Sequence, residues 1–356
     1  MVCYVIGEPE FEASNWYREI VDGLLFEKKQ KRFTIVFGTS GLDLVNCDVK
    51  NDDFVFVIGN DSEWIADTTF ALSERFENRV VVLGNHERRY SGKYSVVTSD
   101  IGANVKMLCE YLTSLGKKRI AMYGINPASV SDTYKATAFK SLMGESAEIY
   151  YNEGSLAKCF DVFADSKHTP DAVICANIYA AVSLMKKIGD SMDISVTSLG
   201  GGLLSEFTKT NITRIESDYR SFAAAGIELA RILVKNDCIS SLTACVKGRF
   251  KPGESTNGIP HRESGAFREC VDTRGDIRFY SDKDVQEMLR IEQMLSQLGD
   301  GDYDMLSNIL EGKTYQHIAE KRFCSEGTVK YKMKHLYDIC GVKGRLEFVE
   351  LIDKYI

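Results

Sequence analysis

Residues 318–330 read IAEKRFCSEGTVK, and this stretch sets the interpretation of the chain around it. Ile318 and Ala319 give the short apolar face that is typical of a helix. Ser325 then offers a side-chain oxygen to the free amide groups that begin the next helix. The stretch therefore predicts a helix, a tight turn and a second helix with a capped start.

The flanking residues extend this pattern over 303–355. Residues 305–310 repeat at helical spacing, Gly312 ends that helix, and 345–355 predict a last one. In the capped helix, one face carries Val329, Leu336 and Ile339, and outside that face lie Lys330, Lys332 and Lys334. Two short helices, a turn and a basic helix form the helix-turn-helix arrangement, which places one helix in the major groove of DNA. The alternative is a small helical bundle that only dimerises.

The same residues resemble the LuxR-type DNA-binding domain. The matching residues are Leu306 through Gly312, Ile318-Ala319-Glu320, Ser325 through Lys330, Gly341-Val342 and Arg345-Leu346-Glu347. Three positions depart from the family pattern: Gly327 replaces Lys or Arg, Cys340 replaces Leu, and Asp304 replaces Glu. The resemblance implies double-stranded DNA as the partner and a DNA-binding set of Ser325, Thr328, Lys330, Tyr331, Lys332 and Lys334.

The composition limits the classes of protein to which the chain can belong. The 356-residue chain has a formal net charge of -7, so any DNA contact must be local. Its 10 cysteines show no C-x-x-C spacing, which indicates reduced core residues. No apolar run suits a signal peptide or a membrane span. We therefore expect a cytoplasmic protein with no membrane partner, no cofactor, no metal site and no enzymatic activity.

One motif suggests a different chemistry. Gly84-Asn85-His86-Glu87 has the form of a turn with which metallophosphoesterases bind metal ions. That chemistry also needs an early Asp-x-His and a late Gly-His-x-His, and the sequence has neither. We interpret the motif as a loop that follows a strand.

Upstream of the helices, short β-rich runs alternate with amphipathic segments, which is the pattern of parallel sheets flanked by helices. The predicted strands are residues 2–6, 33–37, 54–58, 80–83, 94–100, 119–122, 147–150, 172–175, 195–198 and 242–246. So many units predict two lobes, each with its own sheet.

From residue 94 onward the chain resembles the effector-binding domain of the LacI and purine-repressor family. The matching residues are Asp100, Gly116 to Ala121, Lys135 with Ala138-Phe139 and Leu142, Pro170 to Asn177, Asp193 to Val196 and Gly248 to Thr256. The resemblance implies an α/β fold: a two-lobed, type I periplasmic-binding-protein-like sensor with parallel sheets, here followed by a small all-α helix-turn-helix domain. It also implies lobe crossings near 123–127, 215–218 and 246–253, and a small, sugar-like effector between the lobes.

Three residues carry over from the family as ligand-binding residues: Asp100, Lys135 and Asn177. Lys135 replaces an Arg, Ile178 replaces an Asp, and Gly200 falls where a further Asp is expected. Lys offers a point charge where Arg or Asp holds a sugar by paired hydrogen bonds, which favours an anionic or less polar effector. In the alternative interpretation, Asp100 is a helix cap and Lys135 a solvated helix residue.

Residues 282–298 connect the sensor to the predicted DNA-binding helices. Met288, Ile291, Leu295 and Leu298 alternate steps of three and four, which predicts a seam that aligns two chains, or a helix that packs on its own chain. Residues 267–271 and 277–280 predict a hairpin, and 299–302 a flexible joint. We expect a sensor over 1–260, a hairpin and helical linker over 261–301, the DNA-binding domain over 302–356, and a homodimer.

Together these patterns predict a ligand-responsive transcriptional regulator in which a small-molecule effector alters operator affinity. The alternative is a sensor whose cleft binds a partner protein, still with a DNA-binding C-terminus. The absence of acids at Ile178 and Gly200 favours that alternative.

Overall fold

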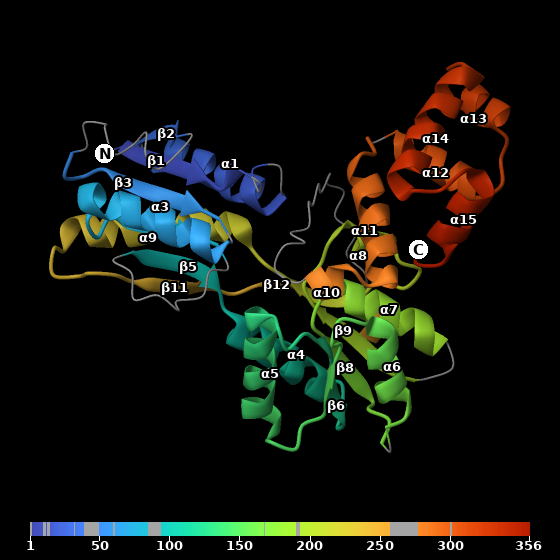
Figure 1. Cartoon of the computed structure of the whole chain (residues 1–356), viewed down its shortest axis with the longest axis horizontal. Coiled ribbons are helices and arrows are strands. Elements are labelled where there is room, and N and C mark those ends of the chain that lie inside the picture. The colour runs from blue at the N-terminus through green and yellow to red at the C-terminus, as the bar shows by residue number, and fades with distance from the viewer. Residues whose placement is uncertain are drawn as a thin grey trace. The chain divides into compact units, whose positions relative to one another are not determined.

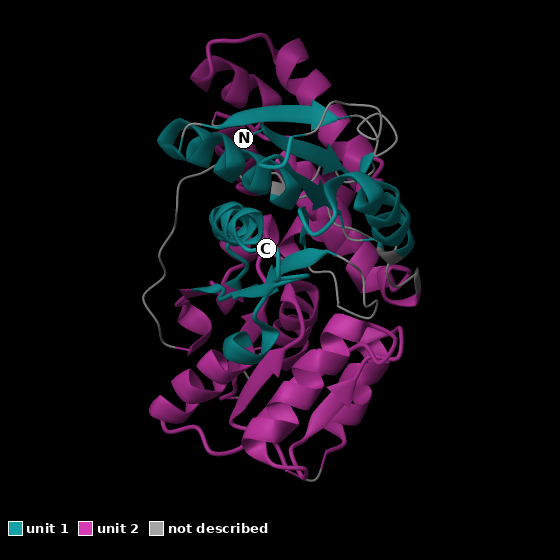
Figure 2. Cartoon of the chain, turned by 90° about the vertical axis from the view of Figure 1, so that its left-hand side faces the viewer, with its two compact units in different colours: residues 1–104, 216–249 teal, residues 105–215, 250–356 magenta. Residues whose placement is uncertain are grey.

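The computed structural model of the chain (Figure 1) describes residues 2–9, 12, 15–31, 33–38, 50–59, 61–84, 94–166, 168–189, 193–256, 277–299 and 301–356. The chain forms two compact units, coloured separately in Figure 2: unit 1 comprises 1–104 and 216–249, and unit 2 comprises 105–215 and 250–356. The first passage between units lies within helix α4 (Ile101–Ser114), before the crossing that we expected near 123–127. The later passages fall between 215 and 216 and between 249 and 250.

Unit 1 is built on a six-stranded sheet of order β11-β5-β4-β3-β1-β2, with neighbouring strands parallel. The strands are β1 (Val2–Gly7), β2 (Thr34–Gly38), β3 (Phe54–Ile58), β4 (Val80–Leu83), β5 (Ser95–Ser99) and β11 (Thr243–Val246). The helices are α1 (Asn15–Lys31), α3 (Ser62–Phe76) and α9 (Tyr219–Lys235). Phe54, Phe56 and Ile58 share a core with α1 and α9, whereas Val55 and Val57 pack with α3. Burial on both faces explains the unbroken apolar runs that predicted these strands.

Unit 2 contains the second six-stranded sheet, of order β12-β10-β9-β8-β6-β7. Its strands are β6 (Ile120–Ile125), β7 (Ile149–Tyr151), β8 (Ala172–Cys175), β9 (Ser195–Leu199), β10 (Thr213–Glu216) and β12 (Arg249–Lys251). The helices α5 (Val130–Met143), α6 (Leu156–Ala164) and α7 (Ile178–Ile188) pack against its strands, and α8 (Leu203–Phe207) follows β9. Strands β6 and β8 pair in parallel, so the loops that follow them lie at one edge of the sheet.

Beyond residue 276 the structure describes helices α10 (Ile277–Tyr280), α11 (Lys283–Ser296), α12 (Asp302–Leu310), α13 (Tyr315–Lys321), α14 (Glu326–Cys340) and α15 (Arg345–Asp353). The four helices predicted between 303 and 355 are therefore confirmed as elements. The hydroxyl of Thr314 accepts a hydrogen bond from the amide of His317, and Ser325 accepts one from Thr328, so both α13 and α14 have capped starts. No helix in the described ranges is long and apolar enough to cross a membrane.

Residues 277–280 form helix α10, so the predicted strand at this position is wrong; its predicted partner, 267–271, lies outside the described residues. Four residues of mixed polarity do not distinguish a strand from a helical turn. Phe279 is buried in the core of unit 2, and the ring of Tyr280 packs against it with centroids 5.2 Å apart. Tertiary packing decides the conformation here.

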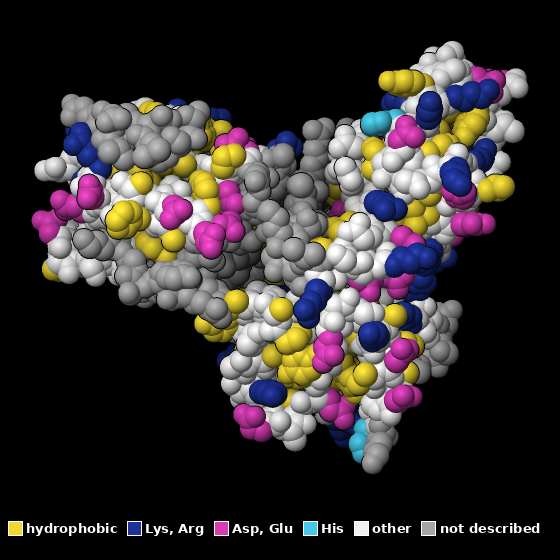
Figure 3. All heavy atoms as spheres, in the orientation of Figure 1, with side chains coloured by type: hydrophobic (Ala, Val, Ile, Leu, Met, Phe, Trp, Pro, Cys, Tyr) yellow, Lys and Arg dark blue, Asp and Glu magenta, His cyan; other side chains and the backbone are white. Residues whose placement is uncertain are grey.

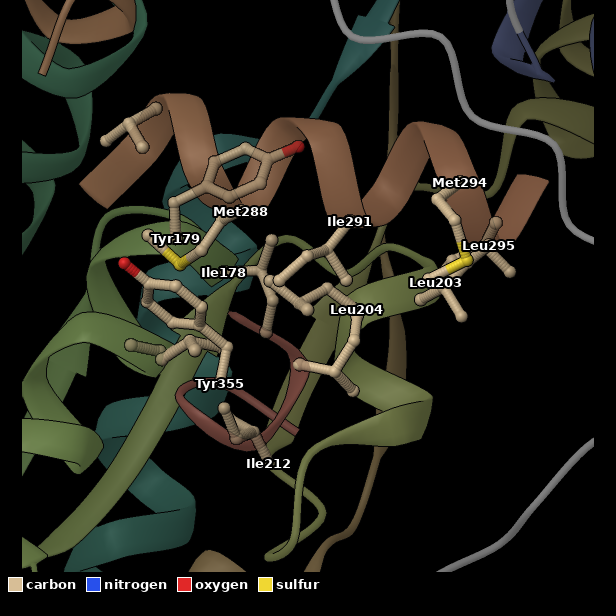
Figure 4. Packing of buried hydrophobic residues seen from close by; sticks show 14 of the residues in the cluster. Ile178, Tyr179, Leu203, Leu204, Ile212, Met288, Ile291, Met294, Leu295 and Tyr355 are labelled. Carbon is tan, nitrogen blue, oxygen red and sulfur yellow. The ribbon is translucent and has the colours of Figure 1, made fainter. Parts of the chain in front are cut away.

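Helix α11 carries the predicted seam, but the seam packs within its own chain. Met288, Ile291, Leu295 and Leu298 are buried in one apolar cluster with residues of the sheet layer and of α14. Figure 4 shows α11 lying over Leu204 and its neighbours from α7 and α8. A seam that aligns two chains is therefore wrong for these residues, and the alternative of a helix packed on its own chain is confirmed.

Aromatic and charged contacts strengthen the same interface. The ring of Tyr303 in α12 stacks on Phe207 in α8, with centroids 5.2 Å apart. The hydroxyl of Tyr355 lies 3.1 Å from Oδ1 of Asp284 and 2.8 Å from Oε2 of Glu287, both on α11. The C-terminal helices and the sheet of unit 2 therefore share one core.

Truncation of Ile291 should destabilise the sheet and the C-terminal helices of unit 2 together. The side chain is fully buried, so Ile291→Ala should lower the free energy of unfolding by about 2–5 kcal/mol. Urea unfolding followed by circular dichroism measures this loss. The control, Ile232→Ala, truncates a part-exposed side chain of α9 and should cost no more than about 1 kcal/mol. The shared core is contradicted if limited proteolysis of Ile291→Ala releases 302–356 while the sheet stays intact.

Candidate functional site

Two candidate effector residues, Lys135 and Asn177, lie where strands β6 and β8 end. The Nζ atom of Lys135, on α5, donates hydrogen bonds to Oδ1 of Asp132 at 2.8 Å and to the carbonyl oxygen of Ala176 at 2.9 Å. Oδ2 of Asp132 accepts a hydrogen bond from the amide of Asn126 at 3.0 Å. The Lys135 side chain is 14% exposed, so its interpretation as a solvated helix residue is wrong. Lys135 and Asp132 thus connect α5 by hydrogen bonds to the loop after β6, at Asn126, and to the loop after β8, at Ala176.

Asn177 and Asp100 both cap helices. Oδ1 of Asn177 accepts a hydrogen bond from the amide of Ala180 at 3.0 Å, at the start of α7. Oδ1 of Asp100 accepts one from the amide of Ala103 at 2.8 Å, at the start of α4, so its interpretation as a helix cap is confirmed. Asp100 belongs to unit 1, whereas Lys135 and Asn177 belong to unit 2 and meet beside Ala176.

The packing of α11 explains why an acid is absent at position 178. Ile178 stands where the resemblance implies an Asp, and it is 3% exposed in the cluster that contains Met288 and Ile291 (Figure 4). A carboxylate buried there without a partner would be strongly destabilising. At the second departure, Gly200 has a φ of 131°, a conformation that favours glycine.

The candidate DNA-binding residues lie on α14 or at its start. The Ser325 Oγ that caps this helix also lies 2.8 Å from Oγ1 of Thr328. Lys330 forms an ion pair with Glu326 one turn earlier, with 2.8 Å between Nζ and Oε1. Tyr331 and Lys334 are exposed, and Lys334 has no ion pair within the described ranges. Figure 3 shows basic and hydrophobic side chains side by side on the surface of the C-terminal helices.

Lys332 forms an ion pair that joins α14 to another of the C-terminal helices, whereas the ion pair of Lys330 lies within α14. The Nζ atom of Lys332 lies 2.6 Å from Oδ1 of Asp302 at the start of α12, and Arg322 donates to the same oxygen at 3.0 Å. Burial acts to raise the pKa of Asp302, but the hydrogen bond from Lys332 and the two positive charges hold that pKa below its ordinary value. The sequence offered no local signal for this cluster, because Asp302 begins α12, Arg322 follows the end of α13 and Lys332 lies in the middle of α14.

A buried carboxyl connects α7 to α11. Glu292 of α11 is 1% exposed and accepts a hydrogen bond from the hydroxyl of Tyr179, which lies two residues after Asn177. Burial raises the pKa of Glu292, and the hydrogen bond from Tyr179 and the nearby backbone of Leu203 and Leu204 only partly offset this. Sequence reasoning missed this pair. The available signal was that Glu292 falls one helical turn after Met288, on the apolar face.

No group of three or more His, Cys, Asp or Glu side chains in the described part of the chain can hold a metal ion. Asn85, His86 and Glu87, from the motif with a metal-binding form, lie outside the described residues. The cysteines that the structure describes are free thiols.

Several solved structures with a similar fold are transcription regulators. The transcriptional regulator CelR in complex with cellobiose is 17% identical over 71% of this chain and 84% of its own, with a TM-score of 0.53. A LacI transcriptional regulator from a Rhodococcus species is 15% identical over 73% of this chain and 100% of its own, with a TM-score of 0.52. The lac repressor dimer bound to operator and the anti-inducer ONPF is 16% identical over 72% of this chain and 81% of its own, with a TM-score of 0.51.

These likenesses establish the fold of the LacI-type sensor domain, a mixed α/β fold with parallel sheets. They give no support for the LuxR-type resemblance of the C-terminal helices. No protein-family model and no curated protein matches the chain.

The buried carboxyl predicts a pH dependence of stability. Because the folded state holds the Glu292 proton more tightly than the unfolded chain, this group's contribution falls as pH rises from the unfolded pKa, about 4.3, through the raised folded value. Glu292→Gln removes this loss, so the variant should gain stability relative to the wild type across that window. Urea unfolding at a series of pH values measures the difference.

Glu287 of the same helix is the control with the opposite sign. Burial acts to raise its pKa, but hydrogen bonds from Lys354 and Tyr355 hold it below its ordinary value. Its contribution is present above the unfolded pKa and is lost in acid. Glu287→Gln should therefore be less stable than the wild type at neutral pH, and this difference should disappear as pH falls. A pH-independent difference for Glu292→Gln would contradict the burial of an ionisable group at this interface.

Proposed function

We propose that the chain is a ligand-responsive transcription regulator whose C-terminal helices bind double-stranded DNA. The observation that carries this proposal is a capped helix, α14, with exposed Lys330, Tyr331 and Lys334, joined through a common core to a sheet with the fold of LacI-type sensors. The order of α12 to α15 supports a LuxR-type helix-turn-helix with α14 in the major groove. Since the whole chain carries a net charge of -7, DNA binding is confined to this local face.

The effector in this proposal is a small molecule, sugar-like or anionic, that contacts Lys135 and Asn177 of unit 2. Asp100 of unit 1 is a separate candidate ligand residue. A lysine has three N–H donors, and Lys135 uses two of them on Asp132 and Ala176, which leaves one for a ligand acceptor. CelR is solved with cellobiose and the lac repressor with an anti-inducer, which favours a small molecule. The alternative of a partner protein gains no support from these similar structures.

Helix α11 offers the route by which an effector alters DNA binding. Helix α7 begins at the Asn177 cap, its Tyr179 bonds Glu292 of α11, and α11 packs on α14. An effector that prefers one arrangement of α7 would therefore bias the position of α14. Coupling of the usual size, about 1–3 kcal/mol, corresponds to roughly 5- to 150-fold in DNA affinity.

A homodimer completes the proposal. Helix-turn-helix proteins bind paired half-sites about a two-fold axis, and the lac repressor is solved as a dimer on its operator. Because the α11 seam is buried in its own chain, the contact between chains must use other surfaces, and we assign it to the sensor over 1–260.

The lysines of α14 should differ in their effect on DNA binding. The probe is a duplex selected by the wild-type protein from a pool with a randomised centre. Lys334→Ala and Lys330→Ala should each weaken binding and lower the slope of log affinity against log salt by about one, whereas Lys332→Ala should leave the slope unchanged. The control is Lys106→Ala, which removes an equally exposed lysine that also has a glutamate one turn away. Unchanged affinity in Lys330→Ala and Lys334→Ala would overturn the assignment of α14.

The effector site is tested by substitutions that keep the helix caps. Asn177→Asp and Asp100→Asn retain a capping oxygen, so the ligand-free protein should melt as the wild type does. A screen of sugars, sugar acids, nucleosides and amino acids should find a ligand that stabilises the wild type by about 2.7 kcal/mol at one hundred times its dissociation constant. Both variants and Lys135→Met should lose most of that stabilisation. A ligand whose stabilisation survives all three substitutions binds elsewhere.

A further inference from the structure

One aromatic side chain of the C-terminal helices is fully presented to solvent on a strained backbone. Phe323 lies in the turn between α13 and α14, and its side chain is 98% exposed. Its φ is 52°, in the left-handed region that bulky L-residues rarely adopt. Such strain persists where the surrounding structure imposes it, and it is a reason to look for a function.

Two neighbouring helices, α12 and α14, end in the same kind of turn with glycine at the left-handed position. Helix α12 ends with hydrogen bonds from Gly312 to Ile309 and from Lys313 to Asn308, the arrangement of a Schellman motif. Helix α14 ends in the same way, with Gly341 at the left-handed position.

Helix α13 repeats this pair of hydrogen bonds, from Phe323 to Glu320 at 3.3 Å and from Cys324 to Ala319 at 3.0 Å. The three turns are thus equivalent in their bonding, and two of them have glycine where α13 has phenylalanine. An almost fully exposed ring contributes no burial to offset the strain, so folding does not explain the choice of Phe323.

The location of Phe323 points to a partner. It lies two residues before Ser325, the cap of α14, and the exposed face of that helix carries Tyr331, Lys330 and Lys334. A positive surface with an apolar ring at its edge suits a polyanion that also offers an apolar group. DNA has both: the phosphates attract the lysines, and the major groove displays the C5-methyl group of thymine, which is the base feature that a phenylalanine contacts.

We propose that Phe323 is a specificity-determining DNA contact, held outward by its left-handed turn so that the ring packs on a thymine methyl group beside the helix start. This inference rests on the proposed DNA binding of α14 and names the base that the turn recognises. The contact is apolar, so it adds affinity for one sequence without adding to the salt dependence.

The test compares Phe323→Gly with the wild type on the duplex selected by the wild-type protein. Glycine suits the turn, so the variant should melt roughly 2–4 °C higher. It should nevertheless bind the selected duplex at least about fivefold more weakly, with an unchanged salt slope, because no phosphate contact is lost. A duplex with deoxyuridine in place of thymine should weaken wild-type binding to a similar degree and leave the affinity of Phe323→Gly unaltered.

The control is Phe70→Ala, which removes an 80% exposed phenylalanine from α3 of unit 1. It should change neither the melting temperature nor the affinity for the selected duplex. If the wild type selects no duplex, the proposed function fails and this inference fails with it. If Lys334→Ala weakens binding but Phe323→Gly binds as the wild type does, DNA binding stands and the role of Phe323 is overturned. A lower melting temperature for Phe323→Gly would overturn the argument from strain.

Discussion

The burial of helix α11 is the constraint on which the arrangement of unit 2 depends. Val285, Met288, Ile291, Met294 and Leu295 are all fully buried. These positions form an apolar surface wider than the narrow stripe of a two-stranded coiled coil, so α11 needs partners on more than one side. It finds them in α7 and α8 on the sheet and in α14 of the C-terminal helices. Within unit 2, the sheet layer and the C-terminal helices therefore share one continuous core.

This constraint reaches the candidate effector residues. Since α7 packs against α11, the position after Asn177 must be apolar, and Ile178 occupies it where the family resemblance implies an acid. The polar groups that remain, Lys135 and Asn177, also hold the loops after β6 and β8 in place. A ligand that bonds to these groups would also change the hydrogen bonds that hold the loops. Because Asn177 caps α7, such a change would alter the start of α7. The Tyr179–Glu292 hydrogen bond is a polar contact between α7 and α11.

Much of the fold could be predicted because its signals are local. The apolar runs of β1, β3, β4 and β8 predict strands buried on both faces, and the Ser325 cap and Gly312 predict the limits of the C-terminal helices.

The misses have a common physical origin in contacts between residues distant in sequence. No short window of sequence contains the packing that decides these features. They are the partner of α11, the helical turn at 277–280 and the ion pair between Lys332 and Asp302. The expected joint at 299–302 is likewise bonded, since Arg322 donates to Gly301 and Asp302. Phe323 looked ordinary in the sequence, and only its backbone angle and exposure distinguish it.

Native-state hydrogen exchange of the full chain, followed through increasing denaturant, tests the central claim most directly. If α11 joins the sheet to the C-terminal helices, the slowest amides of α7, α11 and α14 should converge on one opening free energy, because they are exposed in a single cooperative event. A clearly lower opening free energy for α12 to α15, with α7 and α11 still protected, would show that the C-terminal helices open independently and would contradict the shared core.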